Sequence, residues 1–367
     1  MIRELQELSR SDIYPFHMPG HKRNMEGSVL ASAYGFDITE IDGFDDLRFP
    51  KGLIRAIEKR AEEYYGADRA FLLVNGSTTG NLSAISALVS PGGKLLMGRP
   101  CHVSADNAVE LRGLKPVYLE PETVDGSGIP GGITPEAVRK ALRENEEIEA
   151  VFVTSPTYEG VCSDLDGIAD AVHEKGIPLI ADSAHGAHLK ISSKADVVTV
   201  SLHKTLPAMT STSLCLVNGS KVREDEIKKY INMFQTTSPS YILMAGAEEC
   251  FRMMEEEGES RKKELKQNTE RLLDAMKDHR NIRAVGEEII GKQGVFWHDP
   301  TKICLYDPKG RHSGEEIYKR LLAQYRIQPE KAEDRICLLI ASLMDTREGF
   351  DRLIAAVRGT EQEWARE

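Results

Sequence analysis

The sequence predicts an α/β fold built around a seven-stranded, mostly parallel sheet. Short apolar runs alternate with amphipathic helical patterns from about residue 52 to residue 217, and this alternation places helices on both faces of a parallel sheet. Most of the runs are continuously apolar, as expected for strands that are covered on both faces. The predicted strands are residues 70–74, 94–97, 116–119, 150–154, 178–182, 197–201 and 213–217.

The helical patterns between these strands carry recognisable end signals. In TPEAVRKALREN, Thr134 is placed to cap a helix and Pro135 suits its first turn. In DLDGIADAVHEKG, Asp164 is the predicted cap and Gly176 the stop signal. Both segments are therefore predicted to be helices that pack on the sheet.

The last predicted strand is expected to run antiparallel to the others. Only about a dozen residues separate it from the preceding strand, which is short for a helical crossover between parallel strands. Two long helical patterns follow, near residues 238–257 and 259–280, and the rest indicates a small α+β unit. The chain is thus divided into an N-terminal arm (1–50), a large domain (51–255), and a linking helix with a small C-terminal domain (256–367).

Charge and composition exclude several classes of partner. The formal net charge is −11, whereas a nucleic-acid-binding surface needs a basic field. No apolar run approaches the roughly 20 residues that span a bilayer, and the N-terminal segment does not have the pattern of a secretory signal. The six scattered cysteines form no C-x-x-C pair and indicate buried free thiols. We therefore expect a cytoplasmic protein with no nucleic-acid or membrane partner.

Three short segments place polar residues where predicted strands end, the edge at which open α/β sheets bind ligands. The first segment, VNGSTTGN (residues 74–81), joins a strand to a helix. Its small and hydroxyl residues would present backbone N–H groups and a positive helix end to an anion. An ordinary Gly/Ser turn is the alternative, because the segment matches neither a dinucleotide motif nor a Walker loop.

The second segment, LIADSAHGAH, carries Asp182 at the end of an apolar strand. A carboxylate there needs a partner, and it could keep a heterocyclic nitrogen protonated so that the ring accepts electrons. The alternatives are a helix cap or, given His185 and His188, a metal ligand. The sequence contains no further ligand cluster, and no metal is expected.

The third segment, VSLHKTLPAM, carries Lys204 just after the next predicted strand. Apolar surroundings would lower the pKa of this amine, and a neutral amine is what Schiff-base chemistry requires. A surface lysine is the alternative for a single lysine in a loop. The order of the three segments, with an anion loop, then Asp182, then Lys204, favours the chemical interpretation.

Together with further motifs, these segments resemble the ornithine/lysine/arginine decarboxylase family of fold-type I enzymes, which are aspartate-aminotransferase-like and use pyridoxal 5'-phosphate (PLP). The matching stretches occur in the family's order between residues 14 and 245: PFHMPGHK, EIDGFDDL, NGSTTGN, CHVS, PTYEGVCSDL, DSAHGAH, SLHKTLPA and TTSPSY. PFHMPGHK and SLHKTLPA together make the resemblance specific. It implies a PLP-binding large domain and a homodimer with shared active sites.

The resemblance implies a role for each matching residue. Lys204 would hold PLP covalently, and Asp182 would pair with the pyridinium nitrogen. His102 would stack on the ring face, and His185 would lie near the ring hydroxyl. The other implied cofactor-binding residues in the same subunit are Gly76, Ser77, Thr78, Ser201 and His203, the last four at the phosphate.

Two segments are implied to act across the dimer. Thr236, Thr237 and Ser238 would reach the phosphate bound to the neighbouring subunit, and residues 17–22 of the arm would line the mouth of its site. The partner subunit is therefore expected to complete each active site.

The sequence also departs from the family's pattern. It reads His102-Val103-Ser104 where the family often has His-Lys-Ser. Neither the family's N-terminal wing domain nor its additional C-terminal domain has a counterpart in these 367 residues. A minimal member of the family is expected.

The first functional hypothesis is decarboxylation of lysine, ornithine or arginine to an amine and carbon dioxide. A basic substrate needs an acidic partner for its distal ammonium or guanidinium group. The candidates are Asp42, Asp45, Asp46 and Glu159. A solvated acidic loop is the alternative interpretation of this cluster.

Two other hypotheses are considered. A PLP-dependent aminotransferase or lyase is suggested by Arg335, which opens the apolar run RICLLIA and whose guanidinium suits a substrate α-carboxylate. An arginine on a surface strand is the alternative for this residue. The third hypothesis is a non-catalytic PLP-fold module, but a chain without chemistry need not keep both Lys204 and Asp182.

Overall fold

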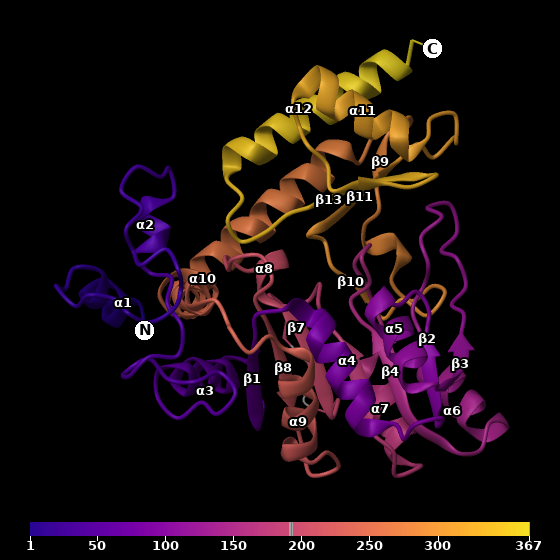
Figure 1. Cartoon of the computed structure of the whole chain (residues 1–367). Coiled ribbons are helices and arrows are strands. Elements are labelled where there is room, and N and C mark those ends of the chain that lie inside the picture. Colours follow the sequence, from indigo (N-terminus) through magenta and orange to yellow (C-terminus); the bar gives the residue numbers. More distant parts are fainter. Residues whose placement is uncertain (191, 193, 367) are drawn as a thin grey trace.

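Seven strands form the central sheet in the order β1-β8-β7-β6-β4-β2-β3 (Figure 1). The computed structural model describes residues 1–190, 192 and 194–366. All neighbouring strands are parallel except β8, which is antiparallel to both β1 and β7. The predicted sheet and its antiparallel last strand are therefore confirmed. Its strands are β1 (Arg69–Leu73), β2 (Lys94–Gly98), β3 (Lys115–Leu119), β4 (Ile148–Thr154), β6 (Leu179–Asp182), β7 (Val197–Ser201) and β8 (Ser213–Val217).

Helices cover both faces of this sheet. One face packs against α4 (Gly76–Leu88), α5 (Val103–Arg112) and α9 (Glu224–Phe234). The other face packs against α3 (Leu53–Tyr65), α6 (Pro135–Glu144), α7 (Leu165–His173) and part of α10 (Tyr241–Met276). Successive side chains of a strand point to opposite faces, so each strand contributes to both layers.

The predicted helix caps on this sheet are present. The side chain of Thr134 accepts a hydrogen bond from the backbone N–H of Ala137 at the start of α6. Asp164 likewise accepts from the N–H of Gly167 at the start of α7. Each cap satisfies a donor that the helix itself leaves unpaired.

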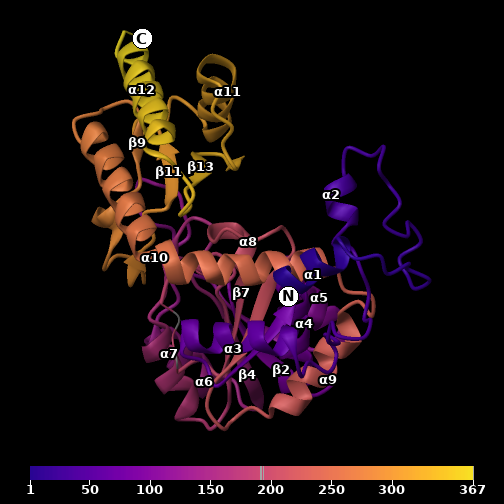
Figure 2. The same ribbon diagram turned by 90° about the vertical axis from the view of Figure 1, so that its left-hand side faces the viewer.

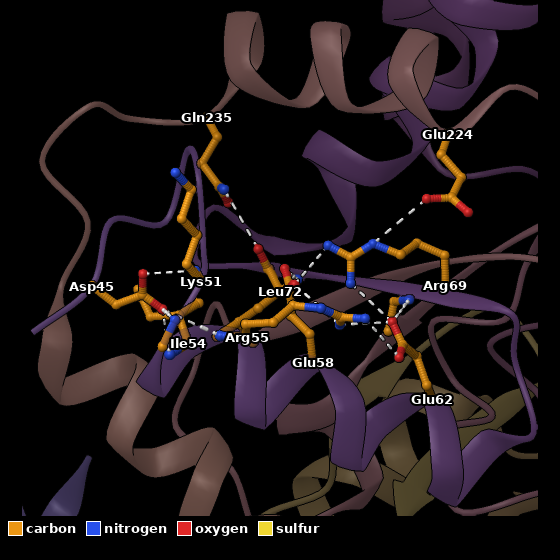
Figure 3. Close-up of polar contacts among 12 residues, drawn as sticks. Asp45, Lys51, Ile54, Arg55, Glu58, Glu62, Arg69, Leu72, Glu224 and Gln235 are labelled. Atoms are coloured by element: carbon orange, nitrogen blue, oxygen red, sulfur yellow. Dashed lines mark hydrogen bonds and ion pairs between the residues drawn. The ribbon is translucent and has the colours of Figure 1, made fainter.

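Side chains cover the free edge of β1 (Figure 3). Backbone N–H groups of β1 and of the residue after it donate to Glu62 Oε1 (3.0 Å), Glu58 Oε1 (3.3 Å) and Gln235 Oε1 (2.9 Å). The Arg69 guanidinium bonds both glutamates. An uncovered strand edge is a template for pairing with another chain, and these acceptors occupy the edge instead.

The helix α10 links the large domain to the small domain (Figure 2). It is one continuous helix of 36 residues, so the prediction of two helices, near residues 238–257 and 259–280, is wrong. Gly258 separates the two predicted segments, yet it is buried inside the helix, and Leu265 and Leu272 continue the buried face beyond it. A glycine inside a helix costs about 1 kcal/mol relative to alanine, which packing along this face offsets.

The small domain is the predicted α+β unit. Its antiparallel sheet has the order β12 (Lys331–Ala332), β13 (Ile336–Ile340), β11 (Lys302–Tyr306) and β9 (Arg283–Ala284). The helices α11 (Gly314–Tyr325) and α12 (Arg347–Trp364) belong to the same unit. Between the domains, β10 (Trp297–His298) pairs with β5 (Val161–Cys162), and the short helix η1 (Glu287–Ile289) precedes it.

The part of the N-terminal arm around the short helix α2 (Ala31–Tyr34) projects away from the sheet in both views (Figures 1 and 2). The arm begins with α1 (Ile2–Ser9), which is tied to α10 by hydrogen bonds from the first two residues to Glu248. Beyond α1, the arm exposes large apolar side chains, with Phe16 90% exposed. Within the described part of the chain, no helix is long and apolar enough to span a bilayer.

Candidate active site

A cavity of about 680 Å³ opens where β4, β6 and β7 end. This is the edge at which open α/β sheets bind ligands, and the volume suits a small-molecule site. The structure brings together in its lining all the cofactor-binding residues predicted within one subunit. These are Gly76, Ser77, Thr78, His102, Asp182, His185, Ser201, His203 and Lys204.

Asp182 is held in place by a buried amide. It is the last residue of β6 and is 2% exposed. Its Oδ2 accepts from Asn81 Nδ2 at 2.8 Å, and its Oδ1 accepts from the Ala184 N–H at 3.1 Å. Asn81 Nδ2 also donates to Ser104 Oγ at 3.0 Å, and that hydroxyl lies 2.8 Å from His102 Nδ1. One hydrogen-bonded chain therefore connects the carboxylate to the histidine at the rim.

Asn81 was missed as a site residue even though it closes the NGSTTGN motif. Asparagine is disfavoured inside a helix, because its amide competes with the backbone for hydrogen bonds. Asn81 is 1% exposed, so its amide needs partners inside the protein. This polar residue on a buried helix face was the available signal.

Lys204 lies beside His185 in the cavity. It belongs to the one-turn helix α8 (Leu202–Thr205), directly after β7, and its Nζ lies 2.9 Å from His185 Nε2. Burial lowers the pKa of Lys204. Burial, followed by the charge of Lys204, lowers the pKa of His185 to about 2. At neutral pH His185 is therefore uncharged, and Lys204 is shifted toward the neutral amine that Schiff-base chemistry requires.

The N-terminus of α4 lies at one end of the cavity. Gly76 adopts a positive φ of 76°, a conformation that glycine takes without strain. The Ser77 hydroxyl lies 2.7 Å from that of Ser201. Gly80 lets the helix approach β7, because a Cβ there would lie 2.6 Å from a methyl of Thr199. Unpaired N–H groups and the positive end of the helix dipole favour a bound phosphate.

The remaining phosphate candidates differ in their surroundings. His203 lines the cavity with its Nδ1 2.9 Å from the Thr212 carbonyl oxygen, and burial lowers its pKa. Thr237 and Ser238 are exposed and lie outside the cavity lining. The Thr236 N–H donates to Asn75 Oδ1 at 3.1 Å, which places this segment beside the start of α4. Its role toward a neighbouring subunit stays a prediction, as does that of residues 17–22.

Only one of the four acids predicted to meet a basic substrate lines the cavity. Glu159 does, whereas Asp42, Asp45 and Asp46 do not. Asp45 instead accepts backbone N–H groups around the start of α3, including that of Gly52 at 2.8 Å. A carboxylate that satisfies a helix N-terminus is engaged in the fold and is not free for a ligand.

The small domain contributes charged residues that the sequence did not reveal. Lys331 and Glu333, in and beside β12, line the cavity with Glu159. Lys331 Nζ lies 3.1 Å from Glu159 Oε1 and 2.6 Å from Glu333 Oε1, and it lies 4.2 Å from the ring centroid of Tyr158. No local pattern separates these residues from surface charges, since only the docking of the two domains brings them to the site.

Arg335, the residue that suggested an aminotransferase, lies outside the cavity. It is exposed just before β13, and its aliphatic stem packs against Gly128. The interpretation of Arg335 as a substrate-carboxylate clamp is therefore wrong for this chain. Arg335 lies in the turn that joins β12 to β13, where the Glu333 N–H donates to the Ile336 carbonyl oxygen at 2.8 Å.

The cavity has the chemical groups that PLP needs. Several buried polar atoms in its lining have no hydrogen-bond partner within the protein: Asn81 Oδ1, Thr154 Oγ1, Glu159 Oε2 and His185 Nδ1. Buried polar atoms are normally paired, so these atoms are suited to a polar ligand. With a desolvated lysine, a buried carboxylate and an anion-binding helix end, the residues present fit PLP.

A metal site is not formed by the described residues. Across residues 1–190, 192 and 194–366, no group of three or more His, Cys, Asp or Glu side chains is placed to hold an ion. His188, the second histidine of DSAHGAH, lies 3.2 Å from Asp299. That contact belongs to a different buried cluster, described below.

A family model described as the major domain of Orn/Lys/Arg decarboxylases matches residues 1–304. This chain belongs to the Orn/Lys/Arg decarboxylase family. An arginine decarboxylase of Bacillus cereus is 30% identical over 98% of this chain and 81% of its own length. The constitutive lysine decarboxylase of Escherichia coli is 26% identical, over 75% of this chain and 40% of its own length.

The solved structure of the Francisella novicida lysine decarboxylase shares the fold of this decarboxylase-family chain. The two superpose with a TM-score of 0.84 at 20% sequence identity, over 99% of this chain. The chain spans 60% of the length of that protein. The fold is thus of the PLP-dependent type I class, and the family assigns the chain to the PLP-dependent amino-acid decarboxylases.

Proposed function

We propose that this protein decarboxylates a basic amino acid, with PLP held covalently on Lys204. The observation that carries the substrate class is the buried Glu159 carboxylate in the cavity lining. Glu159 is 4% exposed, and its Oε2 has no partner within the protein. A distal ammonium or guanidinium group would supply one, and a charge-assisted hydrogen bond in a desolvated site is strong.

The other end of the cavity would hold the cofactor. Ser77, Thr78, Ser201 and His203 would bind its phosphate at the start of α4, and Asp182 would keep its ring nitrogen protonated. When bound, PLP takes up the electron pair that remains at Cα after carbon dioxide leaves. His102, tied through Ser104 and Asn81 to Asp182, would cover one face of the ring.

Proton transfer to Cα is assigned to Lys204 and His185. Their nitrogen atoms lie 2.9 Å apart, within the distance for direct proton exchange. Burial lowers the pKa of both groups, that of His185 to about 2, so His185 is neutral and Lys204 is the member of the pair that carries the proton. The Lys204 ammonium would deliver its proton to Cα after carbon dioxide leaves and would end as the neutral amine, while His185 Nε2 would orient it by accepting a hydrogen bond.

Lys331 would tune recognition of the substrate. Its ammonium already occupies Glu159 Oε1 and Glu333 Oε1, which leaves one strongly negative position for a second cation. A longer or planar cationic group would have to share the carboxylates of Glu159 and Glu333 with Lys331. Arginine, lysine and ornithine are therefore expected to differ in KM, although all three carry the required charge.

The active unit is proposed to be a homodimer in the cytoplasm. The exposed apolar side chains of the arm support a second copy as partner, as does the position of residues 236–238 beside the phosphate end of the cavity. All six cysteines are free, and five are buried, which suits a reducing compartment.

The test is release of carbon dioxide from amino acids labelled at the carboxyl carbon. The PLP-loaded protein is expected to release label from at least one of arginine, lysine and ornithine, and none from leucine. Glu159→Gln is expected to raise KM for that substrate roughly tenfold, since it replaces a charge-assisted hydrogen bond by a neutral one. Glu136→Gln, on an 81% exposed side chain of α6, is the matched control. The proposal is contradicted if the protein releases label from none of these three amino acids.

A further inference from the structure

A buried ion pair ties the small domain to the loop that carries His185. Lys302, the first residue of β11, and Asp299 both have fully buried side chains, with Nζ and Oδ2 3.0 Å apart. Lys302 Nζ also donates to the His185 carbonyl oxygen and to Thr301 Oγ1, each at 3.2 Å. All three protons of the ammonium therefore have an acceptor. Neither charged residue lines the active-site cavity.

Asp299 holds the other end of the same loop. His188 Nε2 lies 3.2 Å from Asp299 Oδ2, while the Thr301 hydroxyl donates to Asp299 Oδ1 at 2.8 Å. Although burial opposes ionisation, the Lys302 ammonium and the bond from His188 hold the pKa of Asp299 well below its usual range. Residues 185 and 188 are thus both anchored to one charged pair from the small domain.

The pair also fixes the loop that contains Glu159. The Asp299 N–H donates to the Gly160 carbonyl oxygen at 2.8 Å. Gly160 has a positive φ of 90°, and a Cβ there would lie 2.9 Å from Lys302 Cβ. Two segments of the site therefore meet at this pair: the His185 loop and the Glu159 loop.

Stability alone does not explain this arrangement. Two charges taken out of water carry a desolvation cost that is often not recovered, and apolar side chains of similar volume would stabilise a core equally well or better. The hydrogen bonds that Lys302 makes are directional, however, and an apolar side chain could not hold the His185 carbonyl oxygen. Orientation of the loop is what this charged pair adds.

We propose that Lys302 and Asp299 are positioning residues, through which the docked small domain fixes the orientation of the His185 ring against Lys204. Lys302 bonds the backbone of His185 and Asp299 bonds His188, so the loop that carries the ring is held at two points. The effect on catalysis rests on the proposed function of Lys204 and His185, whereas the effect on the ring does not.

The test uses the charge-balanced double variant Lys302→Met with Asp299→Asn. Each single variant leaves a buried partner unmatched and is expected to lower the denaturation midpoint. The double variant removes both charges, and its denaturation midpoint is expected to return most of the way to that of the wild type. A matched control is Arg69→Met with Glu58→Gln, which removes a buried pair at β1 far from the site.

The deciding readout is nitrogen NMR of isotope-labelled histidine in the protein without cofactor, with the His185 signals assigned from His185→Gln. The wild type and the control are expected to show one fixed tautomer of His185, and the double variant an averaged pattern. In the loaded enzyme, kcat of the double variant is expected to fall roughly tenfold, with KM within twofold, because misplacement of a reacting group lowers the rate without weakening binding.

An unchanged ring signal and unchanged kcat in the folded double variant would overturn the positioning role. If the double variant does not fold, Thr301→Val decides, since it removes one acceptor of Lys302 without a change in charge. An altered His185 pattern in that variant supports the role, and an unaltered one contradicts it. Because the NMR measurement needs neither PLP nor turnover, its outcome is separate from that of the decarboxylase proposal.

Discussion

Asn81 connects the two residues that would contact the cofactor ring from different directions. Its amide nitrogen donates to both Asp182 and Ser104, and Ser104 contacts His102. Its amide oxygen is buried without a partner in the protein. Loss of this one side chain would leave the Asp182 carboxylate and the Ser104 hydroxyl each with one hydrogen bond fewer.

Asn81→Leu keeps the size of the side chain and removes both hydrogen bonds. The variant is expected to bind PLP roughly tenfold more weakly, because each lost bond to a charged group costs about 1.5–3 kcal/mol before relaxation. An absorbance titration with PLP measures this effect. Asn218→Ala is the control, since Asn218 is also buried but bonds the Ala195 carbonyl oxygen. Equal affinity in Asn81→Leu and wild type would contradict the assigned role.

Residues that carry chemistry at strand ends could be identified from the sequence, while those that depend on docking could not. Asp182 and Lys204 each follow an apolar run, so a polar group there was conspicuous. Asn81 lies in a recognised motif but acts through side-chain hydrogen bonds that no spacing reveals. Lys331 and Glu333 reach the cavity, and Lys302 reaches the His185 carbonyl oxygen, only because the small domain packs on the large one.

Among the elements of the fold, α3 shows how an apparent binding residue can instead be structural. Asp45 accepts N–H groups from Lys51, Gly52 and Ile54 at 2.8–3.0 Å. Although burial opposes it, these backbone hydrogen bonds lower the pKa of Asp45. The carboxylate therefore stabilises the start of the helix as long as it is ionised.

Asp45→Asn is expected to lower the free energy of unfolding by about 1 kcal/mol at neutral pH, because an amide nitrogen replaces one of the two oxygens that accept N–H groups and the negative charge at the helix start is lost. Because the folded-state pKa is lowered, the contribution of Asp45 is complete above the ordinary pKa of 3.8 and is lost as the pH falls through the folded value. Chemical denaturation at neutral and at acidic pH measures the difference. A difference that grows on acidification would contradict this account, and Asp42→Asn in the same loop is the control.

The bounds of the strands were easier to predict from the sequence than whether α10 is one helix or two. The predicted strands agree with the observed ones to within two residues at each end, because buried parallel strands have uninterrupted apolar runs. The prediction of a break in α10 relied on the local weakness of Gly258. Tertiary packing overrode that weakness, since residues on both sides of it share one buried face.

For the whole molecule, the arm is the surface that most needs a partner. It exposes Tyr14 (70%), Phe16 (90%) and Met18 (67%) at alternate positions of one short segment. Contiguous exposed apolar side chains mark interaction surfaces. A second copy of the chain is the proposed partner, and the projection of the arm around α2 away from the sheet leaves it free to reach another subunit.

Phe16→Ser with Met18→Ser is expected to weaken the dimer at least tenfold, since burial of one such side chain contributes roughly 1.5–3 kcal/mol. Sedimentation across a concentration series measures the dissociation constant. Leu322→Ser, on an exposed part of α11, is expected to leave it unchanged. A wild-type protein that is monomeric at all concentrations and still binds PLP would contradict the shared-site proposal.

The central claim is that Lys204 holds PLP in the cavity at the end of β7, and an absorption spectrum tests it most directly. The purified protein mixed with PLP and then freed of excess cofactor is expected to show a visible band that free PLP and Lys204→Ala do not show. That band should shift when the basic amino acid that serves as substrate is added. A wild-type protein without any such band, or a Lys204→Ala variant with an identical one, would contradict the account.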